Sequence, residues 1–151
     1  MHSQKLIDSL SGQWTAALPG VVRLGMDLVH VPRIEESLGD FGQRFAQRLF
    51  TDDEIAYAQS SESERAARFA ARFAAKEATI KALSLSEAGV NWRDMEVQRA
   101  DDGACSLVLR GEALAAAHAL RINRVLVCLS HDGDYAAAVV AALSDTDEPP
   151  P

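Results

Sequence analysis

The chain of 151 residues carries a formal net charge of −7, with 48% hydrophobic and 25% charged residues. These values are typical of one globular domain and exclude a chain that is disordered throughout or a fibrous repeat. The acidic balance excludes a strongly basic nucleic-acid-binding protein, although a local basic patch remains possible.

The domain organisation follows from composition along the chain. We expect residues 1–20 to form an N-terminal extension, residues 21–143 to form the folded domain, and the acidic, proline-rich residues 144–151 to be disordered. No run approaches the ~20 apolar residues that span a bilayer, and the first residues lack a signal-peptide pattern, so we expect a cytoplasmic protein without a membrane anchor. Cys105 and Cys128 are expected to be buried free thiols.

The first half of the domain is expected to be one strand followed by helices. The apolar run over residues 21–29 predicts a buried strand. Short helices are predicted over 32–38 and 41–49, and Gly39 and Gly42 interrupt this region. Thr51 and Glu54 form a capping box, which predicts a helix over 52–59. A long helix is predicted over 63–83, because this segment has good helix formers and no Gly or Pro.

The second half is expected to be mostly strands. Residues 84–93 are predicted to be a loop, and an Asp-Asp-Gly turn at 101–103 predicts strands over 94–100 and 105–110. A helix over 112–120 is followed by a hairpin with strands over 124–130 and 135–143. This order predicts an α+β fold with a small, mainly antiparallel sheet, one long helix and several short helices. Because alanine supplies much of the apolar content, we expect the hydrophobic core to contain little side-chain volume. We therefore expect association of subunits to stabilise the domain.

Two carboxylates stand in unusual places. Asp27 lies in the middle of the apolar first strand, where a carboxylate needs a hydrogen-bond partner, a counter-charge or a metal ion. Glu77 lies at the edge of the apolar stripe of the long helix. Local alternatives exist: Asp27 can bond a neighbouring backbone group, and Glu77 can pair with Lys81 four residues later for ~0.3 kcal/mol.

Cations accumulate on the same long helix. Spacing along the helix places four of them on one broad face, which either binds phosphates or is simply solvated: Arg65, Arg68, Arg72 and Lys76. Two carboxylates near such cations are the parts of a magnesium–diphosphate site. His131 ends a predicted strand and is either functional or merely exposed, and no histidine spacing indicates a zinc site.

The motifs, taken in chain order, resemble the holo-[acyl-carrier-protein] synthase type of 4′-phosphopantetheinyl transferase. The resemblance covers residues 21–143. It rests on Gly25-Met26-Asp27 with Arg33-Ile34-Glu35, on the segment over residues 44–51, on Arg72-Phe73-Ala74-Ala75-Lys76-Glu77-Ala78 with Lys81, and on Ser130-His131-Asp132.

The resemblance implies a small α+β fold that forms homotrimers with active sites between subunits. It implies Mg²⁺-dependent transfer of 4′-phosphopantetheine from coenzyme A (CoA) to a serine of an apo acyl carrier protein, or of a carrier domain in a fatty acid or polyketide synthase. Asp27 and Glu77 would bind Mg²⁺, and Glu77 and Lys81 would be catalytic. The CoA contacts would be Arg72, Lys81 and His131, and the carrier docking surface would be Arg33, Arg44, Phe45 and Arg48.

The sequence departs from the family pattern in two places, and two other functions compete with the one that the resemblance implies. Ser84-Leu85-Ser86-Glu87 stands where the family usually has a glycine-rich turn, so no CoA contact is carried over to residues 84–91, and residues 1–20 have no counterpart in a typical member. A Mg²⁺-dependent nucleotide diphosphate hydrolase would leave the docking residues without a role. A non-catalytic carrier-binding subunit is favoured by the altered turn but opposed by the carboxylates and Lys81.

Overall fold

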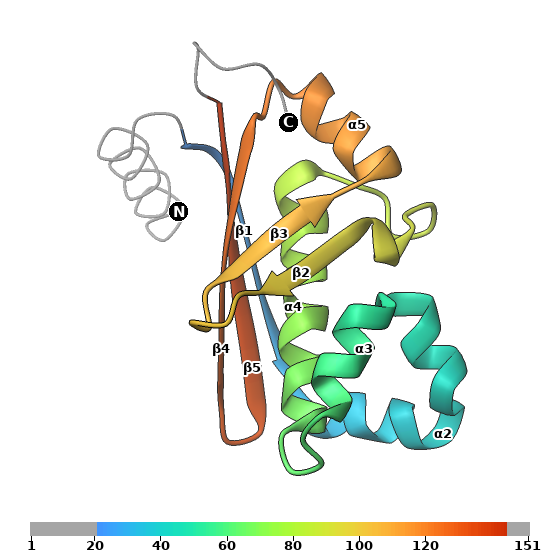
Figure 1. The fold of residues 1–151 in the computed structure, drawn as a ribbon. Coiled ribbons are helices and arrows are strands. Elements are labelled where there is room, and N and C mark those ends of the chain that lie inside the picture. Colours follow the sequence, from blue (N-terminus) through green and yellow to red (C-terminus); the bar gives the residue numbers. More distant parts are fainter. Residues whose placement is uncertain (1–20, 145–151) are drawn as a thin grey trace, which may run out of the picture.

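The computed structural model describes residues 21–144, and their arrangement is shown in Figure 1. The predicted extension over residues 1–20 and nearly all of the predicted tail lie outside the described residues. The domain boundaries therefore stay predictions. None of the helices within residues 21–144 is long and apolar enough to cross a membrane.

The order of elements agrees with the predicted α+β class. The helices and strands are β1 (Val21–His30), α2 (Val31–Leu49), α3 (Asp52–Gln59), α4 (Arg65–Leu83), η1 (Trp92–Asp94), β2 (Met95–Arg99), β3 (Cys105–Leu109), α5 (Gly111–Ala119), β4 (Arg124–Asp132) and β5 (Tyr135–Leu143). The described strands form two antiparallel sheets, one in the order β1-β5-β4 and one of β2 and β3. The single predicted sheet is thus divided into two.

Several predicted boundaries need correction. The two short helices form one element, α2, which is kinked at Gly42, where φ is 57° and ψ is −138°. The long helix begins at Arg65, two residues later than predicted, and part of the predicted loop is the 3₁₀ turn η1. β4 continues through Asp132, so His131 lies inside a strand paired with Ala136 of β5.

Helix α4 lies at the centre of the fold, between the three-stranded sheet and the layer that contains α3 and β2 (Figure 1). Its fully buried positions are mostly small, including Ala70, Ala74, Ala75 and Ala78. They face an alanine-rich side of β5, where Ala136, Ala138 and Ala142 are also buried. Because alanine adds little bulk, the helix backbone lies close to the sheet.

The opposite face of the three-stranded sheet is apolar and exposed. It carries the exposed side chains of Leu24, Met26, Leu28, Leu126 and Val139. The strand register places Met26, Val139 and Cys128 in one row across the sheet. No element within residues 21–144 covers this face (Figure 1). Both cysteines are free as predicted, but neither is buried: Cys105 is half-buried and Cys128 is exposed on this face.

Candidate active site

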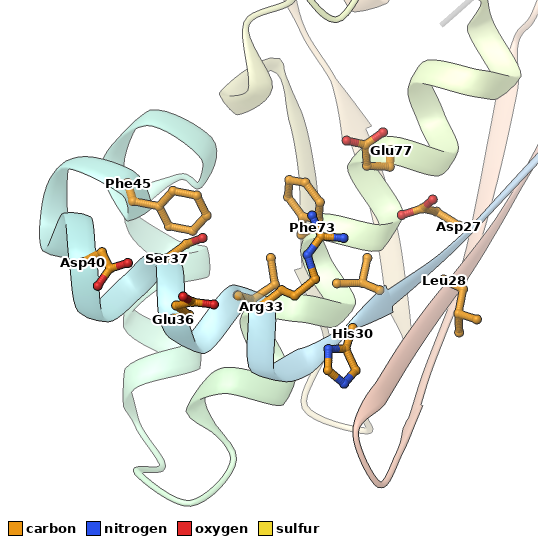
Figure 2. Close-up of a pocket in the computed structure, with 12 residues that line it drawn as sticks. Asp27, Leu28, His30, Arg33, Glu36, Ser37, Asp40, Phe45, Phe73 and Glu77 are labelled. Carbon is orange, nitrogen blue, oxygen red and sulfur yellow. The ribbon is translucent and has the colours of Figure 1, made fainter.

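Asp27 of β1 and Glu77 of α4 lie at one cavity of about 640 Å³, bounded by β1, α2 and α4. Figure 2 shows the two carboxylates on these neighbouring elements, with Arg33 reaching from α2 toward Phe73. Phe45 of α2 lines the same cavity. The fold thus brings together two carboxylates that are fifty residues apart in the sequence.

Asp27 is paired with Lys81. The side chain of Asp27 is only 16% exposed, and its Oδ1 atom accepts a hydrogen bond of 3.0 Å from Lys81 Nζ. Lys81 also donates to the carbonyl oxygen of Met26 at 3.0 Å. The structure therefore gives Asp27 a counter-charge in place of a neighbouring backbone group. Lys81 reaches β1 and, within the described chain, forms no close ion pair with Glu77.

Glu77 has an unusual protonation equilibrium. Its pKa is raised to about 7 by burial, by a hydrogen bond with Glu87 and by the negative charges of Glu87 and Asp27, while Lys81 acts in the opposite direction. Glu87 belongs to the segment after α4 that departs from the family pattern. No helical or strand periodicity relates Glu87 to Glu77, so this contact could not be predicted from the sequence.

The donor set fits a hard divalent cation. The negative charge of Asp27 disfavours the ionised form of Glu77, and a bound cation would relieve this repulsion. Within the described residues, no group of three or more His, Cys, Asp or Glu side chains has a geometry that could hold a metal ion. Two carboxylates with remaining positions filled by water and substrate phosphates are the usual protein site for Mg²⁺.

Arg72 and His131 lie at a different cavity of about 370 Å³, together with Tyr57, Arg68 and Arg99. Neither residue lines the Asp27–Glu77 cavity. His131 Nε2 is 3.7 Å from Glu64 Oε2 at the start of α4. A single chain therefore does not bring all the predicted CoA contacts together, because Arg72 and His131 line this cavity while Lys81 is bonded to Asp27 of the other one.

The prediction that Lys76 lies on a phosphate-binding or solvated face is wrong. Lys76 is fully buried and forms an ion pair of 2.8 Å with Glu54 of α3, and it also donates to the carbonyl oxygens of Trp92 and Met95. Glu54 in turn accepts from the backbone N–H of Val97 at 3.1 Å. Burial lowers the pKa of Lys76 against the opposing effect of Glu54. This pair joins α3 and α4 to β2 and is structural.

Only two of the four predicted docking residues line the Asp27–Glu77 cavity. Arg33 and Phe45 line the Asp27–Glu77 cavity. Arg44 and Arg48 are exposed beyond the kink at Gly42 and do not line that cavity. The first part of α2 also places Glu36 and Asp40 at the cavity, so α2 carries both signs of charge and is not a uniformly basic helix.

The amino-acid sequence is similar to one protein family and to curated members of it. Residues 23–140 match the family model of the 4′-phosphopantetheinyl transferase superfamily. The chain is 42% identical over 123 residues to a holo-[acyl-carrier-protein] synthase of Gloeobacter violaceus, with 80% of this chain and 92% of the relative covered. It is 46% identical over 123 residues to the protein of the same name from Anaeromyxobacter dehalogenans, with 80% and 94% covered.

Solved structures agree with the sequence relatives. An ACPS–CoA complex from Chronobacterium ammoniagenes matches with a TM-score of 0.72 at 34% identity, covering 82% of this chain and 97% of that one. A holo-[acyl-carrier-protein] synthase from Helicobacter pylori in complex with coenzyme A matches with a TM-score of 0.68 at 27% identity, covering 79% and 98%. The fold is thus shared over nearly the whole length of these proteins.

Proposed function

The chain belongs to the 4′-phosphopantetheinyl transferase superfamily, and from this membership we propose how its described residues transfer phosphopantetheine from CoA to a carrier-protein serine. Its relatives carry the name holo-[acyl-carrier-protein] synthase, and solved neighbours contain CoA. The observation that carries the proposal is that Asp27 and Glu77 line one cavity while Lys81 is bonded to Asp27.

Asp27 and Glu77 would hold Mg²⁺, with Lys81 beside them. The ion would neutralise charge on the CoA diphosphate, as metal ions do in phosphoryl-group transfers. Lys81 Nζ already lies at hydrogen-bond distance from Asp27, so a small side-chain movement would direct its charge toward the diphosphate. Its side chain is 54% exposed, which leaves room for that movement.

The transfer is a substitution at phosphorus. The acceptor serine oxygen forms a bond to the β-phosphorus of CoA, the bond from that phosphorus to the bridging oxygen breaks, and adenosine 3′,5′-bisphosphate leaves. The serine proton must be accepted in this step. Glu77 itself, or a water molecule held by the metal ion, would accept this proton.

A homotrimer with sites between subunits is part of the proposal. The separation of the Asp27–Glu77 cavity from the Arg72–His131 cavity supports it, since a site shared by two subunits would use one cavity from each. The exposed apolar face of β1, β5 and β4 also supports it, because such a face is usually covered by a partner. A cytoplasmic location stays a prediction of the sequence.

We place the acidic carrier protein over α2. Arg44 and Arg48 would attract its carboxylates, while Arg33 and Phe45 lie closer to the reacting phosphates. Complementary charges of this kind mainly raise the rate of association and orient the partner. Acyl carrier proteins and carrier domains of larger synthases share the required acidic surface, so both classes belong in the test.

The direct test incubates the protein with CoA, Mg²⁺ and a panel of apo carrier proteins, and then weighs each carrier by mass spectrometry. A carrier that gains one phosphopantetheine supports the proposal. Asp27→Ala and Glu77→Ala should each abolish the gain, while Asp101→Ala in the exposed β2–β3 turn should not. Release of nucleotide without carrier modification would favour a hydrolase, and carrier binding without modification would favour a non-catalytic subunit.

A further inference from the structure

The ring of Tyr57 is surrounded by three guanidinium groups from two other elements. Arg68 and Arg72 of α4 each lie 4.3 Å from the ring centroid, and Arg99 of β2 lies 5.4 Å from it. All four residues line the cavity that also contains His131. Cation–π attraction holds each guanidinium against the ring, but it does not cancel the repulsion among three positive charges.

No carboxylate in the described chain forms an ion pair with these three arginines. The acidic residues nearby have other partners: Glu64 lies 3.7 Å from His131, and Glu54 is bound to Lys76 at 2.8 Å. Arg68 instead donates to the carbonyl oxygen of Tyr57 and to Ser60 Oγ, each at 2.9 Å. The three guanidinium groups therefore give the cavity wall a net positive charge, with Glu64 the only carboxylate among the described residues that line it.

Arg72 supplies a second, independent observation. Only 4% of its surface is exposed, and its Nε atom is the one buried side-chain nitrogen or oxygen of the described residues without a hydrogen-bond partner. Its Nη1 atom reaches only the carbonyl oxygen of Arg68, at 3.4 Å. Burial lowers the pKa of this guanidinium. A buried donor left unpaired is costly, so this arrangement points to an anion as the missing partner.

We propose that Arg68, Arg72 and Arg99 bind a phosphate group of the CoA donor, and that Tyr57 is the positioning residue that holds their guanidinium groups together. Guanidinium groups bind phosphate oxygens through parallel N–H donors, which suits a cluster gathered around one flat ring. The inference rests on the proposed function, because Arg72 and His131 line the same cavity. It adds Arg99 as a binding residue and Tyr57 as its support.

Calorimetric binding without metal tests Arg99. We expect Arg99→Gln to weaken CoA binding about tenfold, as for the loss of one charge-assisted hydrogen bond. Arg93→Gln is the matched control, because Arg93 is exposed, pairs with Asp52 and lines none of the cavities described above. Dephospho-CoA, which lacks the 3′-phosphate, shows which phosphate group Arg99 binds. If Arg99→Gln binds dephospho-CoA as well as the original protein does, Arg99 binds the 3′-phosphate. If Arg99→Gln loses as much affinity for dephospho-CoA as for CoA, Arg99 binds the diphosphate. Unchanged affinity of Arg99→Gln for both donors would overturn the proposal.

Two substitutions at Tyr57 test the positioning role. Tyr57→Phe keeps the ring and should bind CoA like the original protein, whereas Tyr57→Leu should raise the KM for CoA about tenfold and leave the KM for the carrier unchanged. Equal CoA binding by the folded Leu and Phe variants would exclude the positioning role. The proposed function is tested separately: if carriers gain mass while Arg99→Gln binds CoA normally, only this inference fails. If Arg99→Gln weakens CoA binding but no carrier gains mass, only the proposed function fails.

Discussion

A Cβ atom on Gly25 of β1 would lie 1.9 Å from the carbonyl oxygen of Ala78 on α4, far inside contact distance. It would also lie 2.9 Å from the backbone nitrogen of Ala82. β1 and α4 therefore meet backbone to backbone at this crossing. Asp27 follows Gly25 by two positions and Glu77 immediately precedes Ala78, so the same close contact brings the two carboxylates together.

Substitution of Gly25 by alanine should force β1 away from α4. We expect the free energy of unfolding to fall by about 1–3 kcal/mol, the usual cost of overpacking, and transfer activity to fall with it. Urea denaturation measures the first effect. Gly39→Ala is the control, because nothing lies within 4 Å of a Cβ atom there. Equal stability of the two variants would contradict the close-contact argument.

The protonation of Glu77 predicts how stability depends on pH. Its pKa is raised in the folded protein from 4.5 to about 7, so the folded state holds a proton that the unfolded state releases near pH 4.5. This contribution is present below pH 4.5 and is lost as the pH rises to about 7. In EDTA, the thermal midpoint of the original protein should thus fall relative to that of Glu77→Gln across this window. Parallel curves for the two proteins would argue against the raised pKa.

Magnesium should reverse that pH effect at Glu77. A cation held by Asp27 and Glu77 favours their ionised forms, so Mg²⁺ should raise the thermal midpoint at pH 7 by binding the folded state. The increase should be absent in Asp27→Asn and Glu77→Gln. A similar increase in both variants would place the cation elsewhere in the protein.

The buried pair of Lys76 and Glu54 should matter for stability more than for chemistry. Both side chains are 0% exposed, and removal of one member of such a pair typically costs ~3–5 kcal/mol. Lys76→Met should therefore destabilise the fold strongly, and addition of Glu54→Gln should recover part of the loss. For comparison, Arg93→Gln breaks an exposed pair and should cost less than ~1 kcal/mol. Denaturant titrations of the original protein, of Lys76→Met and Glu54→Gln singly, and of the double variant would show whether the two positions are coupled.

The exposed apolar face of β1, β5 and β4 predicts that a charged side chain placed on it will change the oligomeric state. Met26 is 59% exposed in the single chain and lies in the row that includes Val139 and Cys128. In a trimer buried on this face, Met26→Lys should yield folded monomers with little activity. Light scattering at micromolar concentration measures the mass, and Phe41→Lys on α2 should leave it unchanged. An active monomer of the original protein would refute the shared site.

Charge reversal on the second part of α2 tests carrier docking. Arg48→Glu should raise the KM for the carrier about two- to fivefold and weaken its salt dependence, because exposed charges act mainly on association. The affinity for CoA should stay the same, since Arg48 lines neither described cavity. Arg121→Glu, at the exposed end of α5, controls for net charge. If both variants behave alike, α2 is not the docking surface.

Local signals in the sequence were sufficient for the elements and for the family. The capping box at Thr51 and Glu54 forms as predicted, because it depends on residues three positions apart. The long helix over α4 and the hairpin of β4 and β5 likewise follow from short-range propensity and turn chemistry. Asp27 could be identified as unusual from its sequence neighbours alone, because a carboxylate is costly to bury among the apolar residues of a strand in any fold.

Only the tertiary structure decided which charged residues share a site. Arg72 and Glu77 are five residues apart, ~140° around a helix with 3.6 residues per turn, and different elements cover the two sides. Lys76, which the sequence placed with the surface arginines, is paired with Glu54 because α3 folds over that side of α4. Glu87 and Arg99 acquire their roles through contacts with Glu77 and Tyr57, which lie far from them in the sequence. Such partners depend on packing between elements, and periodicity within one element carries no information about them.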